Sequence, residues 1–312
     1  MPTGAPPFLA HLERFERVGS TNDVVRDWLA AGVDEVTVAV ADEQAAGRGR
    51  EGRSWTAPPG AALLVSLGFR PWYLAPDRAW RLAAIVALAM ADAAEDAAGL
   101  PTGTIRLKWP NDLVIVTAGP GASLAADPEV ADPEVADPEV ADPEAAAAEV
   151  RERLATPLEI RKLAGILGET EGLGTDDPRA VVGIGVNADW PASAFPGALR
   201  DSMTSLREAS GGRPIDRDAL LDEFLARLET RLESLRGGRF DVAGWAERQV
   251  TTGRIVRLEG PAGRAELVRA TGVDGASGAL LVEELDRAGG GAERAVLAGE
   301  FGHLRLPASG SV

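Results

Sequence analysis

Apolar residues recur along the chain with two different spacings, and these spacings predict its helices and strands. Apolar positions three or four residues apart predict amphipathic helices, whereas short apolar runs bounded by Gly, Pro or polar residues predict strands. Helices are expected over residues 20–31, 80–97 and 216–236. Strands are expected over residues 35–41, 63–69, 105–109, 113–116, 158–169 and 181–187. The first 249 residues therefore contain both kinds of element, with most of the strands between the helices.

The C-terminal part of the chain has a different texture. From about Val250 onward, short apolar runs alternate with Gly-containing turns at residues 254–258, 265–269, 279–283, 295–297 and 303–306. Strands this short and this closely spaced predict a small β-barrel. We therefore expect two domains, residues 1–248 and residues 249–312.

An acidic repeat interrupts the first domain. The sequence Ala-Asp-Pro-Glu-Val recurs from Ala126 to about Ala145. A proline at every fifth position is incompatible with a regular helix or a sheet ladder, and the uniform negative charge makes the segment repel itself. We expect a disordered insertion at about residues 118–152. Without the nine acidic residues of 125–150 the net charge of −16 falls to −7, so the rest is mildly acidic. That charge argues against a nucleic-acid-binding surface.

Composition excludes several kinds of chemistry. The chain has no cysteine, which rules out disulfides, thiolate nucleophiles and Cys-ligated zinc. Its two histidines, His11 and His303, lie at opposite ends of the sequence. The first residues show no Lys/Arg-rich start followed by an apolar run, so we expect no signal peptide, and the apolar helix of 82–90 meets Asp92 too soon to span a bilayer. We expect a cytoplasmic protein that binds neither membrane nor nucleic acid.

The most distinctive stretch runs from Gln44 to Trp55. Three glycines and three arginines fall within seven positions, at Gly47, Arg48, Gly49, Arg50, Gly52 and Arg53. Glycine lets the backbone approach a bound group closely, and arginine presents a planar fork that matches phosphate or carboxylate oxygens. A solvated basic turn is the alternative, but the clustering in an acidic chain favours a local anion site.

Three more polar stretches follow strand ends or begin helices. They are Ser20-Thr21-Asn22, Lys108-Trp-Pro-Asn-Asp112 and Lys162-Leu-Ala-Gly165-Ile-Leu. Each has a simpler interpretation when taken alone. Ser20 and Thr21 would cap a helix, Asn111 and Asp112 would form a turn, Lys162 would be a surface lysine, and Trp109 would belong to a core. Sites collect at strand ends around one sheet, so their common placement favours a shared site.

In this order the motifs resemble the biotin protein ligase family. The resemblance covers about Ser20 to Asn187, including Gly-Ile-Gly-Val-Asn at 183–187, and the small C-terminal barrel is also as in the family. It implies an α+β fold: a mixed sheet flanked by helices, as in class II synthetase-like biotin and lipoyl ligase catalytic domains, with a C-terminal SH3-like β-barrel. Relatives that repress transcription carry an N-terminal helix-turn-helix domain. Only 19 residues precede Ser20 here, so we expect a monofunctional enzyme.

The resemblance implies a two-step acyl transfer. Biotin and ATP would form biotinyl-5′-AMP, and a lysine of a biotin carboxyl carrier domain would then take the biotin. An anionic carboxylate that attacks a phosphate needs surrounding cations, which the Arg and Lys residues of the motifs supply. Lipoate–protein ligase is the alternative within the fold, but its Arg-Arg-x-Ser-Gly-Gly-Gly stretch is absent from the sequence. A non-catalytic biotin-binding module is the second alternative. The sequence leaves monomer and homodimer open.

The resemblance also implies roles for individual residues. Biotin would contact Ser20, Thr21, Asn22, Gln44, Gly47, Arg48, Arg50, Lys162 and Gly165. ATP would contact Arg50, Arg53, Trp55, Lys108, Asn111 and Asn187. The expected catalytic residues are Lys162, Arg50, Lys108 and Asp112. Mg²⁺ would accompany ATP, with Asp112 as a candidate ligand.

Overall fold

The large sheet contains seven strands. The computed structural model describes residues 7–118, 158–260, 265–284, 292–298 and 303–305. The strands are β1 (His11–Val18), β2 (Thr37–Gln44), β3 (Ala62–Phe69), β4 (Ile105–Lys108), β5 (Asp112–Ala118), β6 (Leu158–Glu171) and β7 (Arg179–Asn187). Their order is β1-β2-β3-β7-β6-β5-β4, with β1 parallel to β2 and all other pairs antiparallel. The predicted mixed sheet is confirmed.

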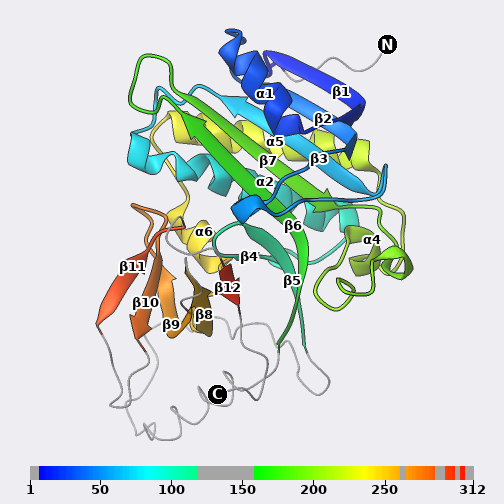
Figure 1. Ribbon diagram of the computed structural model, residues 1–312, viewed down its shortest axis with the longest axis vertical. Helices are drawn as coiled ribbons and strands as arrows, with labels where there is room; N and C mark the ends of the chain where they lie inside the picture. Colours follow the sequence, from blue (N-terminus) through cyan, green and yellow to red (C-terminus); the bar gives the residue numbers. More distant parts are fainter. Residues whose placement is uncertain (1–6, 119–157, 261–264, 285–291, 299–302, 306–312) are drawn as a thin grey trace, which may run out of the picture.

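Helices cover both faces of this sheet (Figure 1). The helices are α1 (Thr21–Ala30), α2 (Trp80–Ala98), α4 (Leu206–Ala209), α5 (Arg217–Arg236) and α6 (Val242–Glu247). Helices α2 and α5 pack against each other and form the main core with one face of the sheet. Helix α2 can do this because it is apolar on nearly all sides, so it is buried between the sheet and α5.

Helix α1 lies on the opposite face, over β2, β3 and β7. Val25 and Leu29 point from the helix into a small second core with Ala39 and Val181. Small residues in the sheet allow α1 to pack close to its surface. A Cβ on Gly68 would lie 2.7 Å from Val25 Cγ1, too near for any other residue without a shift of the helix. The same face of the sheet carries the candidate site, next to the N-terminus of α1.

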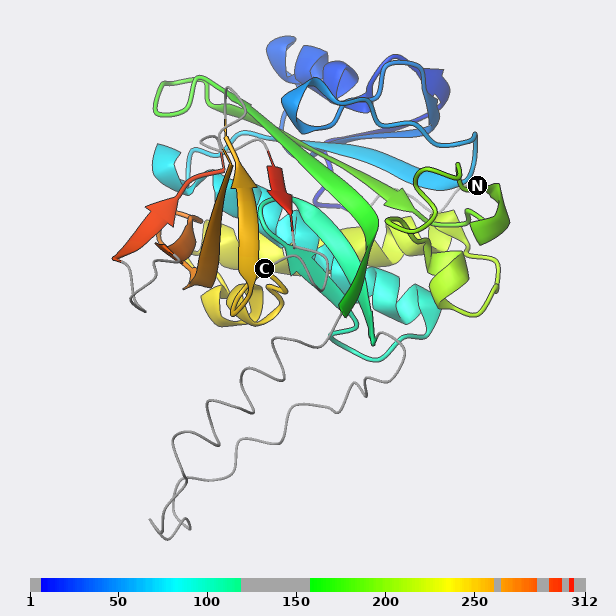
Figure 2. The same cartoon turned by 60° about the horizontal axis from the view of Figure 1, so that its bottom comes forward.

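The C-terminal strands form a second, smaller sheet beside α6, and Figure 2 shows it at one side of the large sheet. The strands are β8 (Ile255–Glu259), β9 (Ala265–Val273), β10 (Leu280–Glu284), β11 (Glu293–Val296) and β12 (His303–Arg305). Their order is β11-β10-β9-β8-β12, and all pairs are antiparallel. The predicted small sheet is therefore present, and its closure into an SH3-like barrel stays a prediction.

The turn between β4 and β5 joins the two sheets. Trp109 is buried in the core of the small sheet, which agrees with its expected core role. Its backbone N–H donates to Thr251 Oγ1 at 3.1 Å, and its indole N–H donates to the Gly278 carbonyl at 3.1 Å. Lys108 and Asp112 are register partners on either side of this turn. The backbone between Lys108 and Asp112 is therefore held by pairing in the large sheet and by the contacts of Trp109 with the C-terminal part of the chain.

Several element ends agree with the sequence signals, and other elements were not predicted. Asp216 caps α5, since its carboxylate accepts the backbone N–H groups of Asp218 and Ala219. Ser20 occupies the N-cap position of α1, although its side chain makes no capping hydrogen bond. Strand β1 and the short helices α4 and α6 were not expected. The predicted insertion at 118–152 lies almost entirely outside the described residues.

Candidate functional site

A cavity of about 280 Å³ opens on the face of the sheet that carries α1. The Gly-Arg loop (residues 44–55) crosses this face over β6 and β7 (Figure 1). Thirteen of the predicted site residues line the cavity: Ser20, Thr21, Asn22, Gln44, Arg48, Arg50, Arg53, Trp55, Lys108, Asn111, Asp112, Lys162 and Gly165. Four motifs that are far apart in sequence therefore meet at one place.

Two predicted residues do not line the cavity. Gly47 lies at the root of the Gly-Arg loop, where an added Cβ would be 2.4 Å from the Trp55 carbonyl oxygen. Asn187 is fully buried at the end of β7, and its amide donates to the Thr204 carbonyl at 2.9 Å. Contact between Asn187 and a ligand therefore requires movement of the segment that contains Thr204.

The Gly-Arg loop is a closed turn whose ends pair with each other. Trp55 N donates to the Gly47 carbonyl at 2.9 Å, and Gly49 N donates to the Arg53 carbonyl at 2.6 Å. Between them, Glu51 and Gly52 have φ values of 56° and 70°. Glycine takes this left-handed region at little cost, so the Gly-rich composition permits the tight tip of the loop.

Trp55 packs on a floor of two glycines. Gly165 of β6 and Gly185 of β7 are register partners, and a Cβ on Gly185 would lie 2.7 Å from the indole. The indole N–H is buried and has no hydrogen-bond acceptor among the described residues. Lys162 Nζ lies 5.6 Å from the ring centroid, within the range of a cation–π contact. In this conformation the loop therefore covers the floor of the cavity with its own side chain.

Lys162 is held at both its backbone and its ammonium group. Its N–H donates to the Ser202 carbonyl at 2.8 Å, and its carbonyl accepts from Thr204 N at 2.9 Å. Its Nζ donates to Asp112 Oδ1 at 2.5 Å. Antiparallel pairing of β5 with β6 places Asp112 opposite Gly165, which brings this carboxylate to the floor of the cavity.

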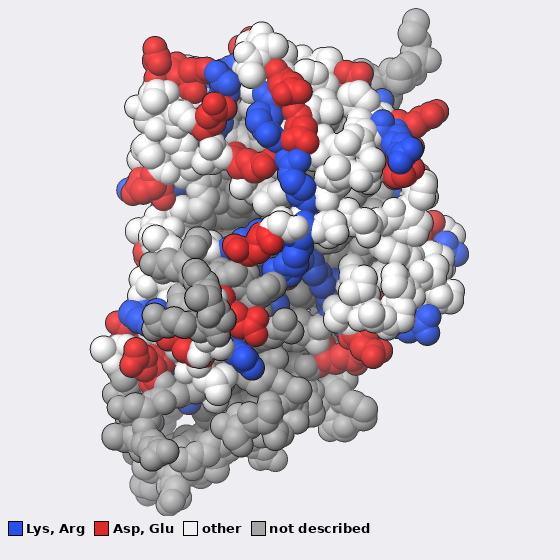
Figure 3. Space-filling view, viewed as in Figure 1, with Lys and Arg blue, Asp and Glu red and all other residues white. Residues whose placement is uncertain are grey.

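The cavity is strongly cationic. Five cationic side chains line it, and Asp112 is the one carboxylate among its described lining residues; the cations are Arg48, Arg50, Arg53, Lys108 and Lys162. Figure 3 shows Lys and Arg side chains in a line down the middle of this face. Burial lowers the pKa of Arg50, whose guanidinium donates to the Ala298 carbonyl. The chain contains 32 Lys and Arg residues, and its two lysines are both in this cavity.

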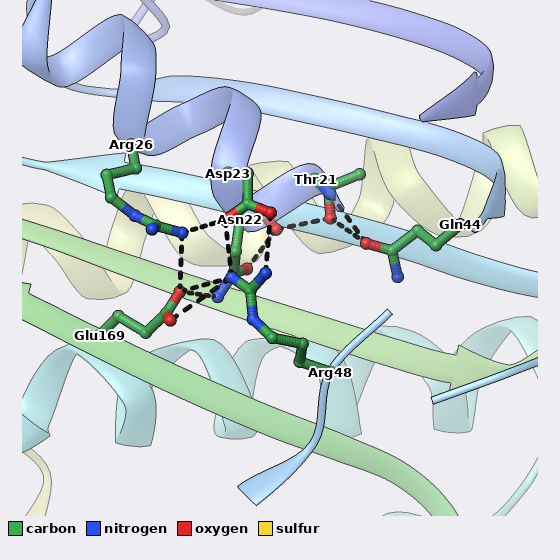
Figure 4. A network of polar contacts seen from close by, with 8 residues as sticks. Thr21, Asn22, Asp23, Arg26, Gln44, Arg48 and Glu169 are labelled. Carbon is green, nitrogen blue, oxygen red and sulfur yellow. Dashed lines mark hydrogen bonds and ion pairs between the residues drawn. The ribbon is translucent and has the colours of Figure 1, made fainter. Parts of the chain in front are cut away.

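Next to α1 the cavity wall contains a chain of neutral polar side chains (Figure 4). Gln44 Oε1 accepts from the backbone N–H of Thr21 at 2.8 Å and lies 3.0 Å from the Thr21 hydroxyl oxygen. Ser66 Oγ lies 2.7 Å from Thr21 Oγ1 and 2.6 Å from Asn22 Oδ1. Asn22 Nδ2 then donates to Glu169 Oε2 at 2.7 Å. One chain of hydrogen bonds thus runs from β2 through α1 and β3 to β6.

Arg48 ties the Gly-Arg loop to α1. Its two terminal nitrogens lie 2.7 and 2.8 Å from the Asp23 carboxylate, and one lies 3.5 Å from Glu169. Arg26 also contacts both carboxylates. Hydrogen bonding to Arg48 lowers the pKa of Asp23, and the same contact raises the pKa of Arg48.

Several residues that build the site lie outside the predicted motifs. Ser66 and Glu169 complete the polar chain, Asp23 holds Arg48, and Arg26 pairs with Asp23. A lone serine within the apolar run of 63–69 was the available signal for Ser66. Leu199 and Met203 line the cavity from the loop after β7, and no sequence signal marks them.

In the described ranges no cluster of three His, Cys, Asp or Glu residues could hold a metal ion. Within the same ranges, none of the helices has the length and apolar character needed to span a membrane.

Comparison with known proteins agrees with the family resemblance. The sequence model of the biotin/lipoate A/B protein ligase family matches residues 14–187, more than half of the 312 residues. The biotin–[acetyl-CoA-carboxylase] ligase of Mycobacterium tuberculosis is 28% identical over 305 residues, which cover 97% of this chain and 92% of that protein. The enzyme of the same description from Paracoccus denitrificans is 29% identical over 286 residues, with 90% and 92% covered. The structure of Aquifex aeolicus biotin protein ligase in complex with biotin and ATP has the same fold, with a TM-score of 0.66, 23% identity, and 95% and 99% of the two chains covered. The chain belongs to the biotin/lipoate A/B protein ligase family.

Proposed function

We propose that the protein is an ATP-dependent biotin protein ligase. In the first step a biotin carboxylate oxygen attacks the α-phosphorus of ATP, the bond to pyrophosphate breaks, and biotinyl-5′-AMP remains. In the second step a lysine amine of a biotin carboxyl carrier domain attacks the activated carbonyl. The bond to AMP breaks, the amine loses a proton, and biotin is joined to the lysine by an amide bond.

The observation that carries this proposal is the asymmetry of the cavity. Arg50, Lys108 and Lys162 gather near Asp112 at one part of it, and a neutral hydrogen-bonding chain lines the other. Adenylation brings a carboxylate against a triphosphate, so fixed positive charge is needed where negative charge accumulates in the transition state. Biotin has a carboxylate at one end and an uncharged cyclic urea at the other. A cavity with these two halves fits such a molecule.

We assign the chemistry to residues that touch the cationic part. Lys162 would exchange Asp112 for the oxygens of the biotin carboxylate and the α-phosphate. Arg50 and Lys108 would neutralise the phosphates. Asp112 would then be released to a Mg²⁺ ion that arrives with ATP, since Mg²⁺ is bound by one or two carboxylates together with substrate phosphates.

The other contacts with biotin and ATP follow the same division between the polar part and the cationic part of the cavity. Ser20, Thr21, Asn22 and Gln44 would bind the urea ring, with Gly47, Arg48 and Gly165 around the rest of biotin. Arg53, Trp55, Asn111 and Asn187 would contact the nucleotide. Trp55 covers Gly165 and Gly185 in the present conformation, so it must move before a ligand can lie on this floor. The loop could then close over the intermediate and exclude water, which would otherwise hydrolyse the mixed anhydride.

Further aspects of the proposal concern the whole protein. Residues 1–248 would form the catalytic domain and residues 249–312 a second domain, whose core includes Trp109. The partner would be the carrier domain of a biotin-dependent carboxylase, and the reaction would take place in the cytoplasm.

The proposal is tested in two stages that separate the half-reactions. The purified protein with biotin and Mg-ATP should release pyrophosphate without an acceptor, and should then add one biotin to a carrier domain, seen by mass on its lysine. A carrier whose acceptor lysine is replaced by arginine is the control for the second stage. Both lysines of the enzyme line the cavity, so a biotin adduct on the enzyme itself is easily recognised by peptide mapping. Absence of pyrophosphate release would refute the proposal.

Lipoate ligation is the second candidate within the family. The lipoyl ring carries no hydrogen-bond donor or acceptor comparable to a urea, so it would leave the polar chain at Thr21 and Gln44 without a partner. We therefore expect lipoate to compete poorly with biotin for adenylation. Equal rates of pyrophosphate release with the two acids would favour lipoate ligation.

A further inference from the structure

Glu169 stands where the two parts of the cavity wall meet, yet it does not line the cavity. Its carboxylate accepts from Asn22 Nδ2 at 2.7 Å and lies 3.5 Å from Arg48 and 3.7 Å from Arg26. The residue is partly buried, near the outer end of β6. Glu169 therefore contacts both the neutral polar chain and Arg48, the arginine that ties the loop to α1 (Figure 4).

Glu169 fixes the direction of the Asn22 amide. An ionised carboxylate can only accept hydrogen bonds, and the Glu169 carboxylate forms ion pairs with Arg26 and Arg48. Asn22 must therefore turn Nδ2 toward Glu169 and Oδ1 toward Ser66. Asn22 is 5% exposed and Ser66 is fully buried, so the contact between these two side chains is made away from bulk water.

At the other end, the Thr21 backbone fixes the direction of the Gln44 amide. The Thr21 N–H donates to Gln44 Oε1, so this oxygen also faces the Thr21 hydroxyl. The chain Gln44–Thr21–Ser66–Asn22 thus has an acceptor at each end and two hydroxyls between them. Three oxygen–oxygen contacts of 3.0, 2.7 and 2.6 Å share two hydroxyl protons. Each hydroxyl can donate one proton, so one contact always lacks a hydrogen.

We propose that Glu169 is a positioning residue that keeps this chain one proton short, so that the polar end accepts a ligand N–H. When the Ser66 hydroxyl donates to Asn22 Oδ1 and the Thr21 hydroxyl donates to Ser66 Oγ, neither hydroxyl donates to Gln44 Oε1. A lone pair of this oxygen is then open at the cavity surface. A cyclic urea supplies an N–H for this position and a carbonyl beside it. The inference rests on the proposed function, because biotin is the ligand that brings the urea.

Replacement of Glu169 by glutamine should supply the hydrogen-bond donor that the chain lacks. The amide introduced at this position could donate to Asn22 Oδ1, and Asn22 could then turn over and donate Nδ2 to Ser66. Ser66 would donate to Thr21, and Thr21 to Gln44. All contacts would be satisfied within the protein, and the ligand N–H would lose its acceptor. The change should therefore weaken biotin binding without weakening the fold.

The test compares Glu169→Gln with Glu171→Gln in the full chain. Glu171 lies two residues further along β6, pairs with Arg179 and does not contact the polar chain. We expect Glu169→Gln to raise the KM for biotin about tenfold, which is the effect of one lost hydrogen bond. The KM for ATP should change less than twofold, and the melting temperature should be unchanged or higher. Glu171→Gln should leave all three quantities as in the wild type.

A double-mutant cycle with Ser66→Ala shows whether Glu169 acts through the chain. Without the Ser66 hydroxyl, the direction of the Asn22 amide no longer determines which way the Thr21 hydroxyl donates. In the Ser66→Ala variant, Glu169→Gln should therefore raise the KM for biotin less than twofold. An unchanged KM for biotin in Glu169→Gln overturns the inference. So does a parallel loss of melting temperature and of both KM values, which would indicate a merely structural role. If the wild type makes no biotinyl-AMP, the proposed function fails; if only the KM pattern differs, the inference alone fails.

Discussion

The two ends of the cavity are built from different groups on different supports. The polar end consists of neutral side chains on α1, β2 and β3, where Thr21 is 3% exposed and Ser66 is fully buried. The cationic end consists of charged side chains on the Gly-Arg loop and at strand ends. There the Lys162 side chain remains 28% exposed. One end is fixed by packing, and the other is open to water.

This difference follows from the energetics of polar and charged groups. Neutral groups can be buried in advance when they satisfy one another, which leaves the site ordered before the ligand arrives. Dry, unpaired cations would be costly in the empty protein. The cationic end is instead kept solvated, and its Lys162 is paired with the carboxylate of Asp112. Substrate binding at that end must therefore exchange ion pairs, whereas binding at the polar end needs little rearrangement.

The largest expected effect is at Lys162, where a cation of the reactive end is removed. We expect Lys162→Ala to lower the rate of biotin-dependent pyrophosphate release by about 100-fold or more, because one preorganised charge at a transition state has this magnitude. The fold should survive, since the backbone of Lys162 is held by Ser202 and Thr204. Lys162→Arg is the matched variant. It keeps the charge but replaces the compact ammonium with a planar fork, and we expect partial activity. Normal turnover by Lys162→Ala would show that the reactive cation lies elsewhere.

The second prediction attacks the polar end without changing any charge. A Cβ on Gly183 would lie 2.1 Å from Asn22 Oδ1, so Gly183→Ala must displace the Asn22 amide. We expect a loss of about 1–3 kcal/mol in the free energy of unfolding, as for an overpacked core, and a raised KM for biotin. Gly168→Ala is the control, because nothing lies within 4 Å of its added Cβ. Equal behaviour of the two variants in denaturant titration would mean that the polar end is not rigid.

The third prediction concerns the loop that completes the cationic end. Arg50 donates to the Ala298 carbonyl and is half-buried between the loop and the small sheet. We expect Arg50→Gly to release biotinyl-AMP about tenfold faster, because the loss of one hydrogen bond to a charged group has this size. Adenylate that remains with the protein after rapid gel filtration measures the effect. Arg239→Gly, an exposed turn position remote from the cavity, should retain adenylate like the wild type. Equal retention by Arg50→Gly would contradict a closing loop.

The fold could be predicted from the sequence wherever one periodicity dominated. Strands 63–69 and 181–187 are continuous apolar runs, and both are buried strands, β3 and β7. Strand β1 was missed because Arg and Glu occupy much of its length at an exposed edge of the sheet, where burial does not impose a clear pattern. Helix α6 has a single fully buried residue, Trp245, which is too little for a periodic signal.

The cavity lining was predictable for a different reason. Its residues lie in short motifs, so proximity in sequence already placed several functional groups together, as in the turn that separates Lys108 from Asp112. Ser66 and Glu169 could not be found in this way. Each is a single polar residue whose partners are 40 or more positions away in sequence. Pairing of β3, β7 and β6, together with packing of α1 on the sheet, brings them to Asn22. Groups that line a site leave local motifs, whereas groups that orient them need not.

The smallest expected effect is at the ion pair of Asp23 with Arg48, which joins the loop to the ordered end. The folded protein lowers the pKa of Asp23 below its ordinary value of 3.8, mainly by hydrogen bonding to Arg48. The contribution of the carboxylate to stability is therefore fully present above pH 3.8 and is lost as the pH falls through the lowered pKa. The wild type should exceed Asp23→Asn in the free energy of unfolding at pH 5–7, by less than about 1 kcal/mol because the pair is partly exposed. This difference should shrink toward zero below the folded pKa. A difference that persisted there would mean that Asp23 acts through packing, and the tie between loop and helix would then not depend on charge.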